Sequence, residues 1–489
     1  MNKKNLPWIA LITINLFWLG LNLRNNAISV IFMPYLVDRF VDESLRNSAL
    51  GGMRTAGLVI AMLVQPAMGL LSDRSRSRYG RRRPFLLAGV LLDLVFLGWI
   101  ALAGNFWSLL AAVLFIQFSS NISHGPLQAL IPDLVPQDQR GRASAVKAIF
   151  ELLPVVLLGL TIAPLVGAGQ FGWAVVATGG GLFIILVITL VTVRETPVET
   201  VVTSPLGPAL VKVLGMLAGI ILGGLVGLAG GIVLGGIAGL AAVILGFSSN
   251  AWMIGLAVGG IAAMAMAVLA GVWAGVRATL GRLPAGQGSF LWWVVNRLMF
   301  LAAITSIQGF APFFLMYAFG VNAERGAAMT GQLMTIVGIF TLVSALPAGW
   351  LSDRVGQKRL LELSGILAAA GTAVLLGTVW LPDMAVITLA GSILGLATGL
   401  FVTVNWALGT RLVPAQEAGR YLGVSNLAGA GAGMIGSGIG GPLADLLNAS
   451  LPGLGYFVIF SGYLLLFLLS SLSLIGVSQQ STSLVQVHG

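Results

Sequence analysis

Long apolar runs separated by short polar connectors dominate this chain of 489 residues. A helix needs about 20 mostly apolar residues to cross the hydrocarbon core of a bilayer. Runs of this kind predict six membrane helices in the first part of the sequence, near 8–36, 48–71, 84–104, 107–132, 143–166 and 172–193. They predict six more in the last part, near 290–319, 327–350, 360–380, 384–410, 421–446 and 454–476. The pattern therefore predicts an all-α membrane protein built from two six-helix bundles.

A further apolar block, roughly 209–276, carries small residues at every fourth position. They are Gly215, Gly219, Gly223, Gly227, Gly231, Gly235 and Gly239, followed after a turn at 247–250 by Gly255, Gly259, Ala263, Ala267, Gly271 and Gly275. Small residues four apart form one stripe on a helix and allow two backbones to come close together. We therefore predict an antiparallel hairpin of two extra helices, which raises the total to fourteen. This hairpin is expected to be a structural linker.

The composition makes lipid the solvent for most of the surface. Hydrophobic residues make up 57% of the chain and charged residues 9%, and the mean hydropathy is +0.97. Soluble domains carry about 25% charged residues. Cysteine is absent and the histidines are His124 and His488, which excludes disulfides, thiolate catalysis and His-rich metal sites. We expect no metal and no cofactor.

The net charge of +10 could indicate a nucleic-acid partner, but most of the basic residues in the connectors lie on one side. The connectors after the second, fourth, eighth and tenth predicted helices hold Arg74, Arg76, Arg78, Arg81, Arg82, Arg83, Arg140, Arg142, Arg354, Lys358, Arg359, Arg411 and Arg420. The opposite connectors hold Arg39, Arg46 and Arg325. Basic residues collect in cytoplasmic connectors. We therefore predict a multi-pass protein of the inner or plasma membrane with both termini cytoplasmic, with the bilayer and not nucleic acid as its partner.

Two segments of the chain echo each other. Gly-Leu-Leu-Ser-Asp-Arg at 69–74 returns as Gly-Trp-Leu-Ser-Asp-Arg at 349–354, and 129–136 is matched by 407–414. The copies occupy equivalent places in the two bundles, which indicates a parallel duplication, and transporters built this way bind their solute near the midplane between the halves. The predicted domains are an N-terminal bundle at 1–195, a linker with the hairpin at 196–285, a C-terminal bundle at 286–480 and a cytoplasmic tail at 481–489.

The repeated Gly-x-x-x-Asp-Arg pattern resembles the loop motif of the major facilitator superfamily. The longer string at 77–84, Ser-Arg-Tyr-Gly-Arg-Arg-Arg-Pro, is similar to that of sucrose-type proton symporters and, more loosely, of glycoside–cation symporters. The resemblance implies a major facilitator fold with a charge network that closes the cytoplasmic side and breaks as the halves rock. It assigns this gate to Gly69, Asp73, Arg74, Gly80, Arg81, Gly349, Asp353 and Arg354. An acid at a helix C-terminus opposes the helix dipole, so Asp73 and Asp353 should have basic partners.

Polar residues inside the predicted helices are the candidates for a solute and ion pathway, because such groups are costly in the membrane. The first predicted helix carries Arg24, Asn25 and Asn26, and the third carries Asp93, a candidate partner of Arg24. The fourth carries Gln117, Asn121, His124 and Gln128 at helical spacing, and the seventh and tenth carry Asn296, Arg297, Gln308, Asn405 and Trp406. Amides and an imidazole both donate and accept hydrogen bonds, which suits hydroxyl groups, and an indole can serve as a sugar platform.

The sequence departs from the sucrose-type pattern in the fourth predicted helix. That family carries an acid and an arginine at the places of Gln117 and Gln128, so coupling to a proton would have to use Asp93, Glu151 or His124. Glu151 has Lys147 one turn away, an arrangement typical of a structural pair.

These features favour a secondary active transporter that works by alternating access, with a sugar or glycoside carried together with a proton or sodium ion. An exporter of amphiphilic compounds or a permease for another solute on the same fold is the alternative. An integral-membrane enzyme is disfavoured, because the connectors carry no Asp-rich metal motif, His cluster or nucleophile constellation. A non-transporting sensor derived from a permease is a further alternative. Such a protein would bind sugars without moving them into liposomes.

Overall fold

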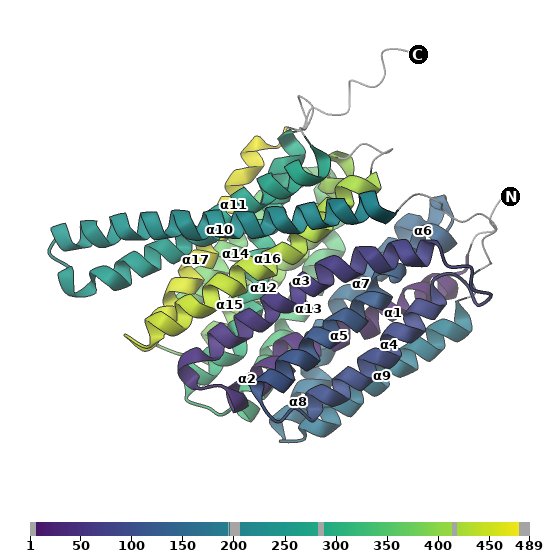
Figure 1. The fold of residues 1–489 in the computed structure, drawn as a ribbon, viewed down its shortest axis with the longest axis horizontal. Coiled ribbons are helices and arrows are strands. Elements are labelled where there is room, and N and C mark those ends of the chain that lie inside the picture. Colours follow the sequence, from purple (N-terminus) through teal and green to yellow (C-terminus); the bar gives the residue numbers. More distant parts are fainter. Residues whose placement is uncertain (1–5, 194, 196–205, 282–287, 413–417, 479–489) are drawn as a thin grey trace, which may run out of the picture. The chain divides into compact units, whose positions relative to one another are not determined.

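The computed structural model describes residues 6–193, 195, 206–281, 288–412 and 418–478. The predicted tail and residues 196–205 of the predicted linker lie outside these ranges. Within them every regular element is a helix, which confirms the all-α prediction (Figure 1).

The six predicted helices of the first part are present, and three of them are broken. They are formed by α1 (Trp8–Asn26), a π turn (Ala27–Phe32) and α2 (Met33–Phe40); α3 (Arg46–Asp73); α4 (Arg83–Ala101); α5 (Phe106–Leu127) and α6 (Leu130–Leu134); α7 (Arg140–Leu157), a π turn (Leu158–Ile162) and α8 (Ala163–Gly167); and α9 (Phe171–Thr192). Pro34 and Pro164 each stand two residues after the last residue of a π turn. Proline lacks an N–H and its ring clashes with the carbonyl four residues earlier, so both widened turns have a cause in the sequence.

The last part forms α12 (Gly288–Phe319), α13 (Ala323–Val355), α14 (Gln357–Leu376), α15 (Met384–Leu412), α16 (Ala418–Asn448) and α17 (Leu454–Ser473). Twelve helices of the described chain are long and apolar enough to cross a membrane. The broken first helix and α16 are not among them, because the first carries Arg24 and several asparagines and α16 is rich in glycine. The chain is a multi-pass membrane protein.

Between the two sets, α10 (Leu206–Ile244) and α11 (Ala251–Leu280) form the predicted antiparallel hairpin (Figure 1). A Cβ on Gly223 would overlap the backbone of Gly271, and one on Gly235 would lie 2.5 Å from the carbonyl oxygen of Gly255. Only a stripe without side chains permits such an approach. The spacing of small residues therefore predicted this contact correctly.

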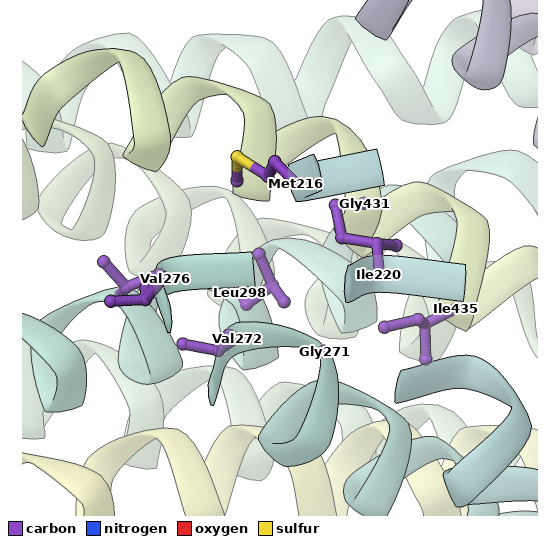
Figure 2. A pocket seen from close by; sticks show the side chains of 9 residues that line it. Met216, Ile220, Gly271, Val272, Val276, Leu298, Gly431 and Ile435 are labelled. Atoms are coloured by element: carbon purple, nitrogen blue, oxygen red, sulfur yellow. The ribbon is translucent and has the colours of Figure 1, made fainter. Parts of the chain in front are cut away.

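The chain divides into two compact units that cut across α12 and α13. The first contains Met1–Val213 and Ala311–Leu342, and the second contains Leu214–Phe310 and Val343–Gly489. The second half of α12 and the first half of α13 thus belong with the N-terminal helices. The second unit also contains a small pocket between the hairpin, α12 and α16 (Figure 2). Its lining is entirely apolar, with Ile220, Val272 and Leu298 among its residues, so it offers no group for recognising a polar solute.

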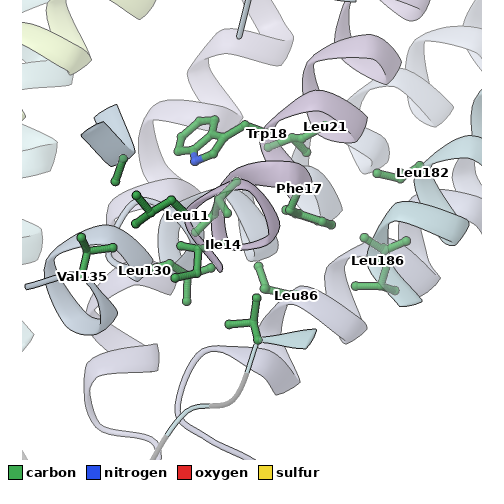
Figure 3. Packing of buried hydrophobic residues seen from close by; sticks show 14 residues of the cluster. Leu11, Ile14, Phe17, Trp18, Leu21, Leu86, Leu130, Val135, Leu182 and Leu186 are labelled. Carbon is green, nitrogen blue, oxygen red and sulfur yellow. The ribbon is translucent and has the colours of Figure 1, made fainter. Parts of the chain in front are cut away.

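The core of the first unit is built around α1. Leu11, Ile14, Phe17, Trp18 and Leu21 of this helix are at most 6% exposed. They pack with buried leucines of α4, α6 and α9, namely Leu86, Leu130, Leu182 and Leu186 (Figure 3). Because α1 is enclosed by its neighbours, the polar residues that follow in its last turn are carried into the interior of the bundle.

Candidate functional site

The structure brings Arg24 of α1 and Asp93 of α4 together in the interior of the first unit. The guanidinium Nη2 lies 2.5 Å from the Asp93 Oδ2, and both side chains are 1% exposed. Arg24 also donates to the Ser120 hydroxyl at 2.5 Å and to the Asn25 amide oxygen at 2.7 Å, and the Ser119 hydroxyl donates to the other oxygen of Asp93. A buried charge is tolerated only when it is paired and hydrogen-bonded, and here each charge has a partner.

The same two helices, α1 and α5, also carry three amide side chains near this level of the chain. Asn22 and Asn26 of α1 each donate their Nδ2 to the backbone carbonyl one turn earlier, at 2.8 Å, and Asn121 of α5 does the same at 2.7 Å. This arrangement uses the donor end of each amide and turns the acceptor oxygen away from the helix. Asn121 is buried, whereas Asn22 and Asn26 are half-buried.

The other predicted residues of α5 are dispersed. His124 lies edge-on to Trp18 with the ring centroids 5.3 Å apart, and Lys147 lies over the same indole at 4.2 Å. Gln117 packs against α3 beside Gly57. Gln128 follows the last residue of α5 and is exposed.

The second unit has its own buried polar network. Asn296 donates to the backbone carbonyl and the hydroxyl of Ser470 at 2.9 and 2.8 Å. Asn405 donates to the Asn296 side-chain oxygen at 3.0 Å and accepts from Arg297 at 3.0 Å. The Arg297 guanidinium lies 5.5 Å from the centroid of Trp406, which is 39% exposed. The structure joins four of the five residues predicted in α12 and α15, and Gln308 is half-buried elsewhere in α12.

Asp73 and Arg81, which the sequence predicts in a gate, belong to a charge network centred on Arg82, the residue that precedes α4. Its guanidinium binds Asp73 at the end of α3 and lies 3.0 Å from Asp133 of α6. It also contacts the Ser72 hydroxyl and the Gly69 carbonyl. Arg82 is 3% exposed. One arginine therefore ties the ends of three helices together.

Neighbouring residues reinforce this network. Arg81 binds Asp133 at 2.5 Å, and this hydrogen bond raises the pKa of Arg81 above its ordinary value. The carboxylate of Glu195, just past α9, accepts the backbone N–H groups of Arg82 and Arg83 at 2.9 and 3.0 Å. Gly80 has φ +100°, and a Cβ there would lie 2.7 Å from the Glu195 Cβ, so the turn requires glycine.

The corresponding ion pair in the second repeat is exposed. Asp353 lies 3.8 Å from Arg411, and the two side chains are 72% and 66% exposed. Arg354 lies over the Trp350 ring at 4.0 Å. Arg411 stands at the repeat position of Asp133, since both are the fifth residue of the matched segments 129–136 and 407–414. The second repeat therefore has a positive charge where the first has the negative charge of Asp133, and Asp353 pairs with this arginine directly.

Sequence reasoning missed Arg82, Asp133 and Glu195 as members of this charge network. Arg82 was counted only among the residues that orient the chain. The signal for Asp133 was present, because it lies in a repeated segment next to the repeated loop. Glu195 carries no such signal, since its role depends on the fold bringing the end of α9 to the start of α4.

Comparison with known proteins agrees with this architecture. The family model described as Major Facilitator Superfamily matches residues 282–437, and the model described as MFS/sugar transport protein matches residues 18–200. The crystal structure of a D-xylose-proton symporter superposes with a TM-score of 0.62 over 96% of each chain at 16% sequence identity. At this identity the likeness concerns the fold alone. The fold is that of the major facilitator transporters, with two extra helices.

Among curated proteins, the chain is 29% identical over 135 residues to the sucrose transport protein SUT4 of Oryza sativa subsp. indica, which covers 23% of this chain and 22% of that protein. It is 34% identical over 177 residues to the proton-associated sugar transporter A of Homo sapiens, which covers 31% and 22%. The chain thus spans about a fifth of the length of the curated relatives it matches. The two family models therefore match one segment in each part of the chain, 18–200 and 282–437.

Proposed function

We propose that this protein is a secondary active transporter of the plasma membrane that carries a sugar or glycoside together with a proton by alternating access. Both termini would lie in the cytoplasm, and the larger number of basic residues in the connectors of one side supports this orientation. The observation that carries the proposal is the buried Arg24–Asp93 pair, a titratable carboxylate held by a guanidinium in the interior of the first unit.

A proton fits the coupling site better than sodium. Both oxygens of Asp93 are engaged, one by the Arg24 guanidinium and one by the Ser119 hydroxyl. A sodium ion bound to Asp93 would lie beside the fixed positive charge of Arg24, and the two cations would repel each other strongly in a low-dielectric interior. A proton instead neutralises Asp93, breaks the ion pair and frees the guanidinium to bind another acceptor.

The amides support a polyhydroxylated solute. Asn22, Asn26 and Asn121 donate their Nδ2 to their own helices, so their oxygens can accept from hydroxyl donors, which a sugar presents on every side. A guanidinium released from Asp93 would be able to donate to sugar oxygens. Proton binding and sugar binding would therefore favour each other, which is the requirement for symport.

The charge network around Arg82 supports a gate on the cytoplasmic side. Movement that separates α3 from α4 and α6 must break the contacts of Arg82 with Asp73 and Asp133. The network would therefore stabilise one arrangement of these helix ends relative to another, as an alternating-access gate does.

The substrate class is tested by counterflow in proteoliposomes, without any ion gradient. Vesicles are loaded with unlabelled sucrose, maltose or an aryl glycoside and diluted into the radiolabelled compound. Transient uptake of label above that of protein-free vesicles is expected for at least one of them. Folded protein that exchanges none of these sugars would contradict the sugar assignment.

A further inference from the structure

The second half of α12 and the first half of α13 pack within the first unit through very close contacts. A Cβ on Gly159, in the π turn after α7, would overlap the Gly331 carbonyl and the Thr335 hydroxyl of α13. A Cβ on Gly167 would lie 2.7 Å from the Ala328 Cβ. Here α7–α8 and α13 touch backbone to backbone, which small residues permit.

A polar contact closes the end of this interface. The Tyr35 hydroxyl of α2 donates to Oε1 of Glu324, in the first turn of α13, at 3.1 Å. Phe171, the first residue of α9, stacks on Tyr35 with a centroid distance of 5.0 Å and an angle of 20° between the planes. Phe171 also lies edge-on to Phe32 at 5.1 Å. Residues 289 positions apart, Tyr35 and Glu324, thus join the first broken helix to α13.

The helices that make these contacts carry the two π turns of the chain's described part. Ala27–Phe32 lies between Arg24 and Tyr35, and Leu158–Ile162 contains Gly159. π turns bend helices and occur often at functional sites. The first one releases the Ser29 carbonyl to accept from Arg54 Nη2 at 2.6 Å. Each contact surface is therefore attached to its helix through a turn with an irregular hydrogen-bond pattern.

We propose that Tyr35, Phe171 and Glu324 form an external latch, which holds α2 against the start of α13 on the side opposite the Arg82 network. The sides are opposite because α3 runs from Arg46, just after the latch segment, to Asp73 in that network. Release of the latch, with bending at the two π turns, separates Gly159 from Gly331 and admits the solute. The inference rests on the proposed alternating-access function and identifies the residues that control its external side.

The latch is tested by cysteine labelling, for which the natural absence of cysteine is an advantage. Thr335→Cys places a nearly isosteric thiol at the interface, twelve residues into α13. A membrane-impermeant thiol reagent is applied from outside to intact cells. Tyr35→Phe removes the donor of a hydrogen bond to a carboxylate, so we expect labelling to be about fivefold faster, since bonds of this kind favour one state by about 1.5–3 kcal/mol when buried and less when half-buried. Tyr79→Phe, the same change at an exposed tyrosine of the opposite side, should leave the rate unchanged.

Glu324 provides a second and independent variant. Glu324→Ala should label as fast as Tyr35→Phe, whereas Glu324→Gln keeps an acceptor and should label at an intermediate rate. Equal labelling in the parent, Tyr35→Phe and Glu324→Ala would overturn the proposal, as would faster labelling in Tyr79→Phe. The labelling assay needs no solute, so it is independent of the sugar assignment. Unchanged labelling in a protein that transports sugar would contradict the latch alone. Faster labelling in a protein that transports no sugar would contradict the sugar assignment alone.

Discussion

The Arg24–Asp93 pair gives the sharpest quantitative prediction. Asp93→Asn keeps the size of the side chain and removes its charge, which leaves a guanidinium that is 1% exposed without its counter-ion. Removing one partner of a buried ion pair costs about 3–5 kcal/mol. Arg24 retains Ser120 and Asn25 as neutral acceptors, so we expect the lower end of that range, about 3 kcal/mol.

The assay is thermal unfolding of purified protein in detergent for a complete double-mutant cycle. Each single variant, Asp93→Asn and Arg24→Gln, should lower the Tm by at least about 5 °C, since 1 kcal/mol corresponds to about 2–4 °C in chains of 150–250 residues. The double variant contains no buried charge and should regain most of this loss. Its loss of unfolding free energy should be smaller than the sum of the two single losses, by a coupling energy of about 2–3 kcal/mol.

Two results would refute this reasoning. A parental Tm in Asp93→Asn would mean that the carboxylate is not charged in the folded protein. A double variant whose loss equals the sum of the two single losses would mean that the residues do not interact.

Three further predictions follow from the contacts. Arg82→Gln should lower turnover at least tenfold and affect solute binding much less, whereas Asp353→Asn should have a small effect because its ion pair is exposed. Gly223→Leu should destabilise the protein by several kcal/mol in thermal unfolding, because its side chain would enter the backbone of α11, and Gly224→Leu should be neutral because nothing lies within 4 Å of its Cβ position. Asn405→Ala should lower the Tm by several degrees, because it removes two hydrogen bonds between α12 and α15.

Each of these has its own contradictory outcome. Equal losses of turnover in Arg82→Gln and Asp353→Asn would show that the burial of the Arg82 network does not matter for transport. Equal stability of the two glycine variants would show that the α10–α11 contact is not tight. An unchanged Tm in Asn405→Ala would mean that water replaces both bonds.

Much of this fold could be predicted from the sequence, because hydrophobic run length and the spacing of small residues determine where membrane helices lie and how closely they pack. The ends of the helices were less predictable. The helix predicted at 327–350 extends over Ala323–Val355, because its terminal turns carry polar residues that look like connectors. The π turns were not predicted, although Pro34 and Pro164 supplied a signal for a disturbed turn at both places.

The site was predictable residue by residue but not as a set of contacts. Arg24 and Asp93 were recognised because charges in apolar helices are costly, yet their pairing depends on the packing of α1 against α4 and α5. The charge network at the end of α3 depends on Arg82 and Asp133, which are 51 positions apart, and no spacing rule connects residues in different helices. Packing selects which of several neighbouring arginines is buried, and that choice is a property of the folded chain.

The central claim, proton-driven sugar transport through Asp93, is tested most directly by accumulation in proteoliposomes. A sugar that shows counterflow is offered under an imposed proton gradient, a sodium gradient or no gradient, with parent protein and with Asp93→Asn. We expect the parent protein to accumulate the sugar under the proton gradient alone. Asp93→Asn should not accumulate it under any gradient but should still carry out counterflow. Accumulation driven by sodium, or equal accumulation by Asp93→Asn, would contradict it.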